Sequence, residues 1–261
     1  MRTDQLVISG LSNTGILSRA RRNPRTGNAA TGNAGSITVT AGQVELYDGG
    51  GIRTDTQSTG KGGTINVVAD SLLIVGRADT GRPITIDSGI TSNASPGSMG
   101  NAGDVTVTAH DLVVRGGGPR SVAGISSATA AGASGNAGTV SVSGHSIALA
   151  NGAKISTENA SSGTGGPVQL NASDTLTMDR AEILARTTTQ EGGDVTVAVG
   201  RLFDLRDSRV TTSVAGGLGK GGNIIMDMPL MVLDASRIEA NAQEIAELKT
   251  ELARPWWRRL I

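Results

Sequence analysis

The sequence predicts an all-β solenoid, a right-handed parallel β-helix of about seven to eight three-strand coils with a short C-terminal helix. Three observations lead to this fold. A glycine-rich motif returns at near-regular intervals, short runs alternate apolar and polar residues, and the 261 residues include 38 glycines but only 2% aromatics. Tight turns account for the glycine content, and a narrow column of aliphatic side chains can form a core with few aromatic residues.

The motif is clearest at residues 32–35, Gly-Asn-Ala-Gly, just before the strand-like run of residues 36–40. A glycine precedes each later run in the same way, and these anchors are Gly35, Gly63, Gly103, Gly138, Gly166, Gly193 and Gly222. Successive anchors are 28, 40, 35, 28, 27 and 29 residues apart. A period near 28 residues over most of the chain is typical of stacked repeats.

Each repeat has three short apolar stretches. The first follows the anchor by two and four residues: Ile37/Val39, Ile65/Val67, Val105/Val107, Val140/Val142, Val168/Leu170, Val195/Val197 and Ile224/Met226. The second is Val44/Leu46, Leu72/Ile74, Leu112/Val114, Ile147/Leu149, Leu176/Met178, Phe203/Leu205 and Met231/Leu233. The third is a single residue: Ile52, Ile90, Ile125, Ile155, Ile183, Val210 and Ile238.

Spacing by two places both side chains of a pair on one face of a strand. Apolar residues spaced three and four apart, which would indicate a helix, are absent inside the repeats. An antiparallel sandwich also has short strands, but its inward residues need not recur at the same position every 28 residues. Three strands per repeat therefore predict parallel coils, with the right-handed crossover that parallel strands favour.

The sequence divides into three parts. Residues 1–31 form a partial N-terminal coil and loop, residues 32–243 the β-helix repeats, and residues 244–261 a helical cap or tail. Leu6 and Ile8 match the second stretch and Ile16 matches the third, so the pattern begins within a coil. We therefore expect either a fragment of a longer protein or the product of an internally started reading frame.

The last part changes from strand-like to helical spacing. Ile245, Leu248 and Leu252 share one helical face, and Pro255 ends the helix before the two tryptophans at 256–257. This segment is expected to cover the open end of the solenoid, which would otherwise invite edge-to-edge association. The alternative is that it lies on a membrane interface.

Charge and composition exclude several classes of function. Lysine plus arginine equals aspartate plus glutamate at 23 each, so nothing favours nucleic acid or an acidic membrane surface as a partner. No cysteine is present for disulfides or thiol chemistry, and no cofactor is expected. No run approaches the length of a spanning helix. Residues 1–4 lead into a strand, so no signal peptide is expected in this chain.

Two repeats are lengthened at the junction between their second and third strands, around residues 76–83 and 116–120. Insertions on one face of a repeat protein often form its binding surface. Four arginines lie in or beside them, and we expect a basic flank that binds acidic polysaccharide, made of Arg77, Arg82, Arg115 and Arg120. The alternative is neutral drift of loop length.

Three polar residues occupy one position in consecutive repeats, seven residues after the anchor: Asp70, His110 and His145. Such a column could hold a zinc or copper ion, or it could be an ordinary exposed polar ladder. The turns after the second strands carry Asp48, Asn151, Asp179, Asp207 and Asp234. These side chains could bind calcium or cleave polysaccharide, but Asx residues also favour turns for local reasons.

The repeats resemble those of filamentous haemagglutinin-like exoproteins, in particular the cyanobacterial form. The likeness rests on the Gly-Asn-Ala-Gly units at 32–39 and 135–142 and on residues 149–157, and it covers roughly residues 5–243. The resemblance implies a right-handed β-helical adhesin exported by two-partner secretion. Neither the secretion domain of that family nor its signal peptide is recognised in this chain, and its Trp-Trp-Arg-Arg ending is unusual for the family.

That resemblance also implies a location and partners. The parent protein is expected outside a Gram-negative-type bacterium or on its outer membrane. Its expected partners are an outer-membrane transporter and host or environmental glycans or surface proteins. We therefore expect an adhesive rod that mediates attachment or aggregation.

The alternative function is a polysaccharide-active β-helix enzyme, similar to a pectate lyase or polygalacturonase. Such an enzyme needs clustered acids beside an arginine or lysine in a groove. The outward residues of the first strands are instead small and polar: Thr38, Asn66, Thr106, Ser141, Gln169 and Thr196. The sequence therefore predicts no catalysis and no catalytic residue.

Overall fold

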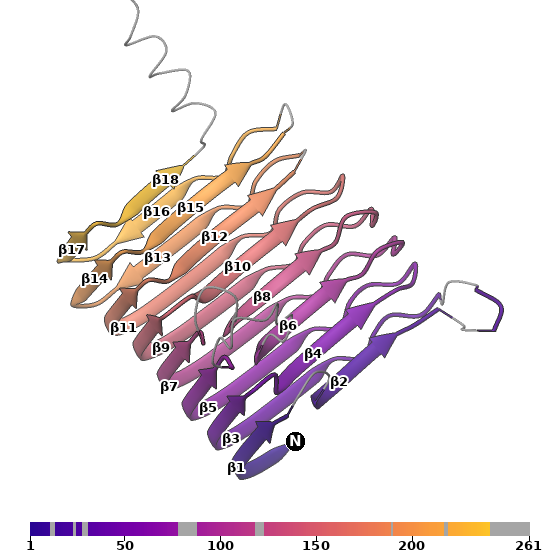
Figure 1. The fold of residues 1–261 in the computed structure, drawn as a ribbon, viewed down its shortest axis with the longest axis horizontal. Coiled ribbons are helices and arrows are strands. Elements are labelled where there is room, and N and C mark those ends of the chain that lie inside the picture. Colours follow the sequence, from indigo (N-terminus) through magenta and orange to yellow (C-terminus); the bar gives the residue numbers. More distant parts are fainter. Residues whose placement is uncertain are drawn as a thin grey trace, which may run out of the picture.

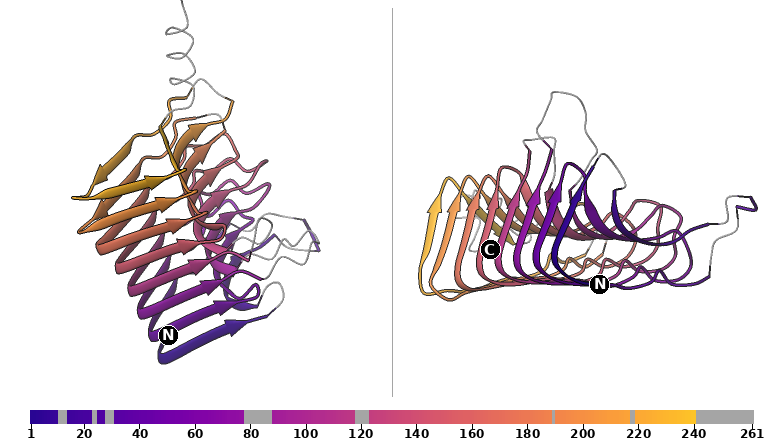
Figure 2. Two further views of the ribbon diagram at one scale, coloured as in Figure 1. Left: turned by 60° about the vertical axis from the view of Figure 1, so that its left-hand side comes forward. Right: turned by 90° about the horizontal axis from the view of Figure 1, so that it is seen from below.

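The predicted parallel β-helix is confirmed by a computed structural model, which describes residues 1–10, 14–22, 25–27, 31–77, 88–117, 123–188, 190–216 and 219–240. These residues form 18 strands in two sheets, with parallel pairing from each coil to the next. Figures 1 and 2 show the coils following one another along one axis. The expected C-terminal helix and cap fall within residues 241–261, outside the described residues.

The first sheet has ten strands: β1 (Arg2–Ser9), β3 (Ile37–Tyr47), β5 (Ile65–Val75), β7 (Val105–Arg115), β9 (Val140–Ala150), β11 (Val168–Asp179), β13 (Val195–Val199), β14 (Leu202–Arg206), β16 (Ile224–Asp227) and β17 (Met231–Asp234). The second sheet has eight: β2 (Gly15–Ala20), β4 (Gly51–Thr56), β6 (Ser88–Ala94), β8 (Ala123–Thr129), β10 (Ala153–Asn159), β12 (Glu182–Thr187), β15 (Arg209–Val214) and β18 (Arg237–Ala240). One second-sheet strand per coil gives eight coils in the described residues. None of those residues forms a helix that could span a membrane.

The first two apolar stretches of a repeat usually lie on one bent strand. In β5 the inward residues Ala69 and Leu72 are separated by two outward residues, Asp70 and Ser71, so the alternation shifts phase at the bend. Backbone pairing with the adjacent coils continues on both sides of it. The two stretches become separate strands only in the last two coils, as β13/β14 and β16/β17.

The predicted apolar ladders form the core. Ile155, for example, pairs with Ile125 and Ile183 in the coils on either side, and all three are fully buried. From β3 to β15 every apolar ladder residue predicted from the sequence is buried. The final coil is the exception: Leu233 is 53% exposed, because the described residues place no further coil over it.

The anchor glycines are needed because consecutive coils touch there. A β-carbon at Gly138 would lie 2.5 Å from the Gly103 carbonyl oxygen, and one at Gly166 would lie 2.0 Å from that of Gly138. Both distances are shorter than van der Waals contact, so a side chain would force the backbones apart. The anchors from Gly63 to Gly222 all meet the preceding anchor in this way. Close approach therefore explains the glycine period.

A buried column of hydroxyl groups ties the second sheet to these anchors. Thr54 donates to the Gly63 carbonyl at 2.7 Å, and Thr212 donates to the Gly222 carbonyl at 2.7 Å. In the middle of the rod, Ser127 donates to the Gly103 carbonyl at 2.9 Å and accepts from the Gly138 amide at 2.9 Å. In these coils the inward face is apolar on one side and hydrogen-bonded on the other, which satisfies backbone groups of the glycine turn. Ala185 interrupts the column in the coil of β12, between Thr157 and Thr212.

We expect Gly138→Ala to lower the free energy of unfolding by about 1–3 kcal/mol, the usual range for overpacking a tight site. Gly32→Ala is the matched control, because a β-carbon at Gly32 would meet nothing within 4 Å. Denaturant unfolding of both variants measures the difference. Equal midpoints for the two variants would show that carbonyl contact does not select glycine at the anchor.

Candidate functional site

The roots of the two insertions lie side by side, as the sequence predicts. Val75 pairs with Arg115, the Gly76 amide donates to the Arg115 carbonyl at 2.7 Å, and the returning strands pair at Ser88 and Ala123. Arg115 is exposed and Arg77 is half-buried. Arg82 and Arg120 lie outside the described residues, so the four-arginine flank stays a prediction.

His110 and His145 stack at the bend of the first sheet. Their ring centroids are 4.8 Å apart, with the planes tilted by 32°. The register of the flanking residues places Asp70 beside His110 in the preceding coil. His110 Nδ1 contacts Asp111 at 3.1 Å, while His145 Nδ1 contacts Ser173 at 3.2 Å. The described residues contain no group of three histidine, cysteine or acidic side chains that could hold a metal ion, so the predicted metal ladder gains no support.

Two carboxylates near this stack are stabilised in their ionised form. The Ser146 hydroxyl donates to Asp111 at 2.6 Å and, with His110, lowers the pKa of that carboxyl. Arg201 donates to both oxygens of Asp174, at 2.6 and 2.9 Å, and lowers the pKa of Asp174. A general acid in glycoside hydrolysis needs a raised pKa. The lowered pKa of each carboxyl therefore argues against a role as general acid.

The Asx residues of the turns behave partly as predicted. Asp48, Asn151 and Asp207 adopt left-handed backbone conformations, with φ of 51°, 55° and 47°, which Asn and Asp tolerate well. In two other coils the expected aspartate lies one residue before the left-handed position. Asp179 and Asp234 end strands β11 and β17, and the left-handed positions are Arg180 (φ 50°) and Ala235 (φ 48°).

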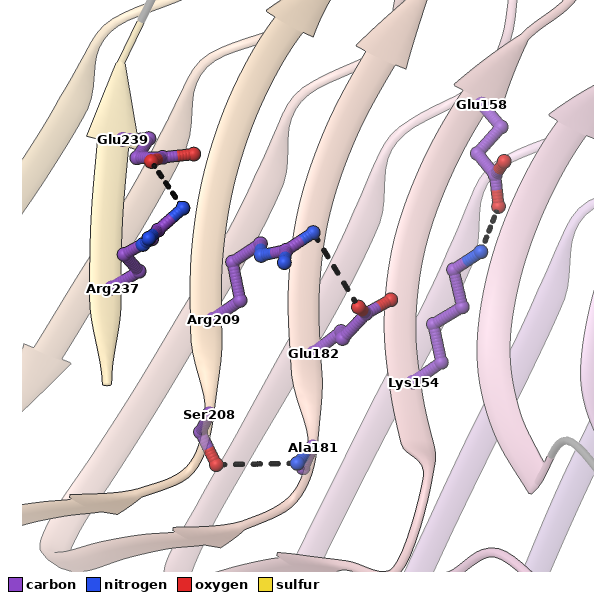
Figure 3. A network of polar contacts seen from close by, with 8 residues as sticks. All are labelled: Lys154, Glu158, Ala181, Glu182, Ser208, Arg209, Arg237 and Glu239. Atoms are coloured by element: carbon purple, nitrogen blue, oxygen red, sulfur yellow. Dashed lines mark hydrogen bonds and ion pairs between the residues drawn. The ribbon is translucent and has the colours of Figure 1, made fainter. Parts of the chain in front are cut away.

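A groove of about 600 Å³ opens beside this turn, at the start of the second-sheet strands of the last four coils. We call it the arginine groove and define it by Lys154, Arg180, Glu182, Arg209 and Arg237. Strand register places Lys154, Glu182, Arg209 and Arg237 in one column, and Figure 3 shows them side by side. In the four earlier coils the same column holds glycine: Gly15, Gly51, Gly89 and Gly124.

Acids partly balance the cations of the arginine groove (Figure 3). Lys154 pairs with Glu158 at 2.5 Å and Arg237 with Glu239 at 3.4 Å, whereas Arg209 is 4.0 Å from Glu182. Arg209 and Arg237 are 53% and 70% exposed. Below them the Ala181 amide donates to the buried Ser208 hydroxyl at 3.2 Å, which fixes the groove floor.

A second depression, of about 520 Å³, lies on the first-sheet side of the same turn. It brings together acids and arginines: Asp179, Asp204, Asp207, Asp234, Arg115, Arg180 and Arg206. The sequence pattern pointed to Asp179, Asp207 and Asp234 as turn residues that could cleave polysaccharide, but it did not place Asp204 or the arginines beside them. Two of the acids are already paired, Asp204 with Arg206 at 3.0 Å and Asp179 with Arg180 at 2.9 Å.

The sequence pattern also did not single out the arginine groove, although a signal was present. Each residue of its column comes directly before the residue of the third apolar stretch in its coil. Those third-stretch residues are Ile155, Ile183, Val210 and Ile238. Charged residues at that offset occur only in the later repeats. Aligning the repeats on these ladder residues would have placed the four charges side by side.

We expect Arg180→Asn to raise the free energy of unfolding by about 0.5–1 kcal/mol, because asparagine adopts the left-handed conformation at lower cost than arginine. The bonds that Arg180 donates to Asn151 and Asp179 lie on an exposed side chain and contribute little. Arg206→Asn, at a strand end, is the control and should give no gain. Denaturant unfolding that shows no gain for Arg180→Asn over this control would refute the strain at Arg180.

Comparisons with known proteins add no identification. No family model matches the chain, and no match is found among curated proteins or among solved structures.

Proposed function

We propose that this chain is a structural and adhesive β-helical rod, a segment of a secreted bacterial surface adhesin that mediates attachment or aggregation. The observation that carries the proposal is the in-register stacking of the coils. Because each outward position recurs in the next coil, the rod displays columns of like groups along its length. Such a surface suits repeated weak contacts with a repetitive partner.

The outward column of the first sheet illustrates this. Thr106 pairs with Ser141 and Ser141 with Gln169, so small polar groups follow one another at about 4.8 Å, the spacing of adjacent strands. The Ser141 hydroxyl donates to the Gln169 side chain at 3.2 Å. Individual surface contacts of this kind are weak, so attachment through them would depend on many copies.

The proposal includes the location and partners that the family resemblance implies. The rod acts outside the cell or on the outer membrane of a Gram-negative-type bacterium. Its ligands are glycans or surface proteins, and the parent protein is exported by a two-partner transporter. Neither nucleic acid nor a cofactor is part of this function.

A polysaccharide-active enzyme is the second candidate function, and one observation favours it. The depression that holds Asp179, Asp204, Asp207 and Asp234 beside three arginines has the residue types that cleavage of acidic polysaccharide needs. Against it stand the ion pairs Asp204–Arg206 and Asp179–Arg180, which already engage two of the acids. We therefore rank adhesion first.

Adhesion is tested with beads that carry the full chain at several surface densities, applied to bacterial, plant and animal cell layers. We expect retention on at least one layer that rises more steeply than in proportion to density, because attachment is multivalent. Beads that carry the heat-unfolded chain are the control. Retention that never exceeds this control would contradict the adhesive function.

We also expect no release of reducing ends or unsaturated products from pectin, alginate or cellulose by the purified chain. Asp179→Asn and Asp207→Asn provide the matched variants, since both residues line the acidic depression. Product formation that disappears in either variant would establish the enzyme function in place of the adhesive one.

A further inference from the structure

We propose that the arginine groove binds the acidic groups of a polysaccharide that lies along the rod axis. The ligand class is a carboxylate- or sulfate-bearing glycan. This inference rests on the proposed adhesive function and deepens it by naming a ligand and a surface. It places the contact on the second-sheet strands of the last four coils, away from the predicted flank at the insertions.

The groove is lined mainly by cations: Lys154, Arg180, Arg209 and Arg237, against the acids Glu182 and Asp207. Acids beside the lining pair with three of these cations, Glu158 with Lys154, Asp179 with Arg180 and Glu239 with Arg237, so the groove has no net excess of positive charge. Exposed ion pairs of this kind contribute little to stability, so an acidic ligand can replace the protein's own acids. Guanidinium groups match carboxylate and sulfate geometry well, which favours a ligand with these groups.

Arg209 and Arg237 lie next to each other in the column, where two positive charges favour an added counter-charge. These residues are direct register partners on adjacent parallel strands, and like charges placed opposite each other destabilise a sheet. Arg237 has Glu239 at 3.4 Å, but the nearest acid recorded for Arg209 is Glu182 at 4.0 Å. An acidic group seated between the two guanidinium groups would relieve their repulsion.

Arg180 adds a third guanidinium from the turn above the column. It occupies a left-handed position where neighbouring coils use Asn151 and Asp207, residues better suited to that backbone. Its Nη2 donates to Asn151 at 2.6 Å and to Asp179 at 2.9 Å, which holds the head group against the turn. A residue that costs stability but supplies a positioned cation is typical of a binding surface.

The direction of the ligand follows from the spacing of the coils. Arg209 and Arg237 lie one strand spacing apart, about 4.8 Å, and Lys154 lies two coils before Arg209 with Glu182 between them. A polymer with acidic groups at intervals can meet Arg209 and Arg237 together and Lys154 separately. Glu182 can accept hydrogen bonds from sugar hydroxyls at the gap between them.

The neighbouring depression limits the ligand to this side of the turn. Its lining holds four acids, Asp179, Asp204, Asp207 and Asp234, against three arginines. A polyanion would meet an excess of negative charge there. The acidic polymer is therefore expected to stay on the second-sheet side and not to cross the turn.

The test measures binding of the full chain to immobilised polygalacturonate and heparin at low salt, with neutral dextran and double-stranded DNA for comparison. The groove variant is Arg180→Ser/Arg209→Ser/Arg237→Ser. The matched control is Lys61→Ser/Arg201→Ser/Lys220→Ser, which removes the same charge from exposed positions outside the groove. Circular dichroism and melting curves verify that both variants are folded.

We expect the chain to bind at least one acidic glycan, with about a tenfold loss in the groove variant and less than twofold in the control. Polygalacturonate or heparin preference identifies carboxylate or sulfate as the ligand group. Equal losses in the two variants, tighter binding to DNA than to either glycan, or no binding would overturn the proposal.

If the groove variant unfolds, the single variant Arg180→Asn takes its place, because we expect it to be stabilised while losing binding. Beads that carry the groove variant separate this inference from the adhesive function. Beads that adhere as well as the parent's would refute the groove and leave adhesion intact. Failure of the parent chain itself to adhere would refute the function.

Discussion

The close contact between anchor glycines is the constraint on which the rest of the structure depends. Each anchor glycine from Gly63 to Gly222 lies against the carbonyl of the preceding anchor with no room for a β-carbon. That contact fixes the relative position of two coils at one corner, and the strand ladders then follow in register. The glycine contact holds adjacent coils in the same relative position. An insertion of ten or more residues between β5 and β6 therefore leaves the pairing of Ile90 with Ile52 and Ile125 intact.

Most of the fold could be predicted from the sequence, because the repeat places chemically similar residues in one ladder. The apolar ladder through Ile125, Ile155 and Ile183 follows directly from spacing relative to the anchors. The bend in the long strands and the buried hydroxyl column do not follow from that spacing. Thr54 and Ser127 follow the inward residues Ile52 and Ile125 by two positions, so alternation puts them on the same face, but their polarity alone would assign them to solvent. They face inward and bond the glycine carbonyls.

The candidate sites were less predictable, since they depend on register to within one residue. His110 and His145 stack as expected, but His110 contacts the adjacent Asp111 whereas His145 contacts Ser173 in the next coil. Asp179 was expected in a turn and instead ends a strand, and that shift of one residue puts Arg180 at the groove. A shift of one residue within a repeat is small compared with the variation in repeat length, so the sequence pattern does not resolve it. That shift nevertheless decides which charged side chains lie together.

The most direct test of the stacked-coil account is the distance between spin labels placed in one outward column by pulsed electron paramagnetic resonance. Cysteine is absent from the chain, so pairs introduced at Thr38/Gln169 and Thr38/Thr196 would be labelled alone. Register places these pairs four and five coils apart, which predicts separations of about 19 and 24 Å. Separations that do not rise by about one strand spacing per coil would contradict the account.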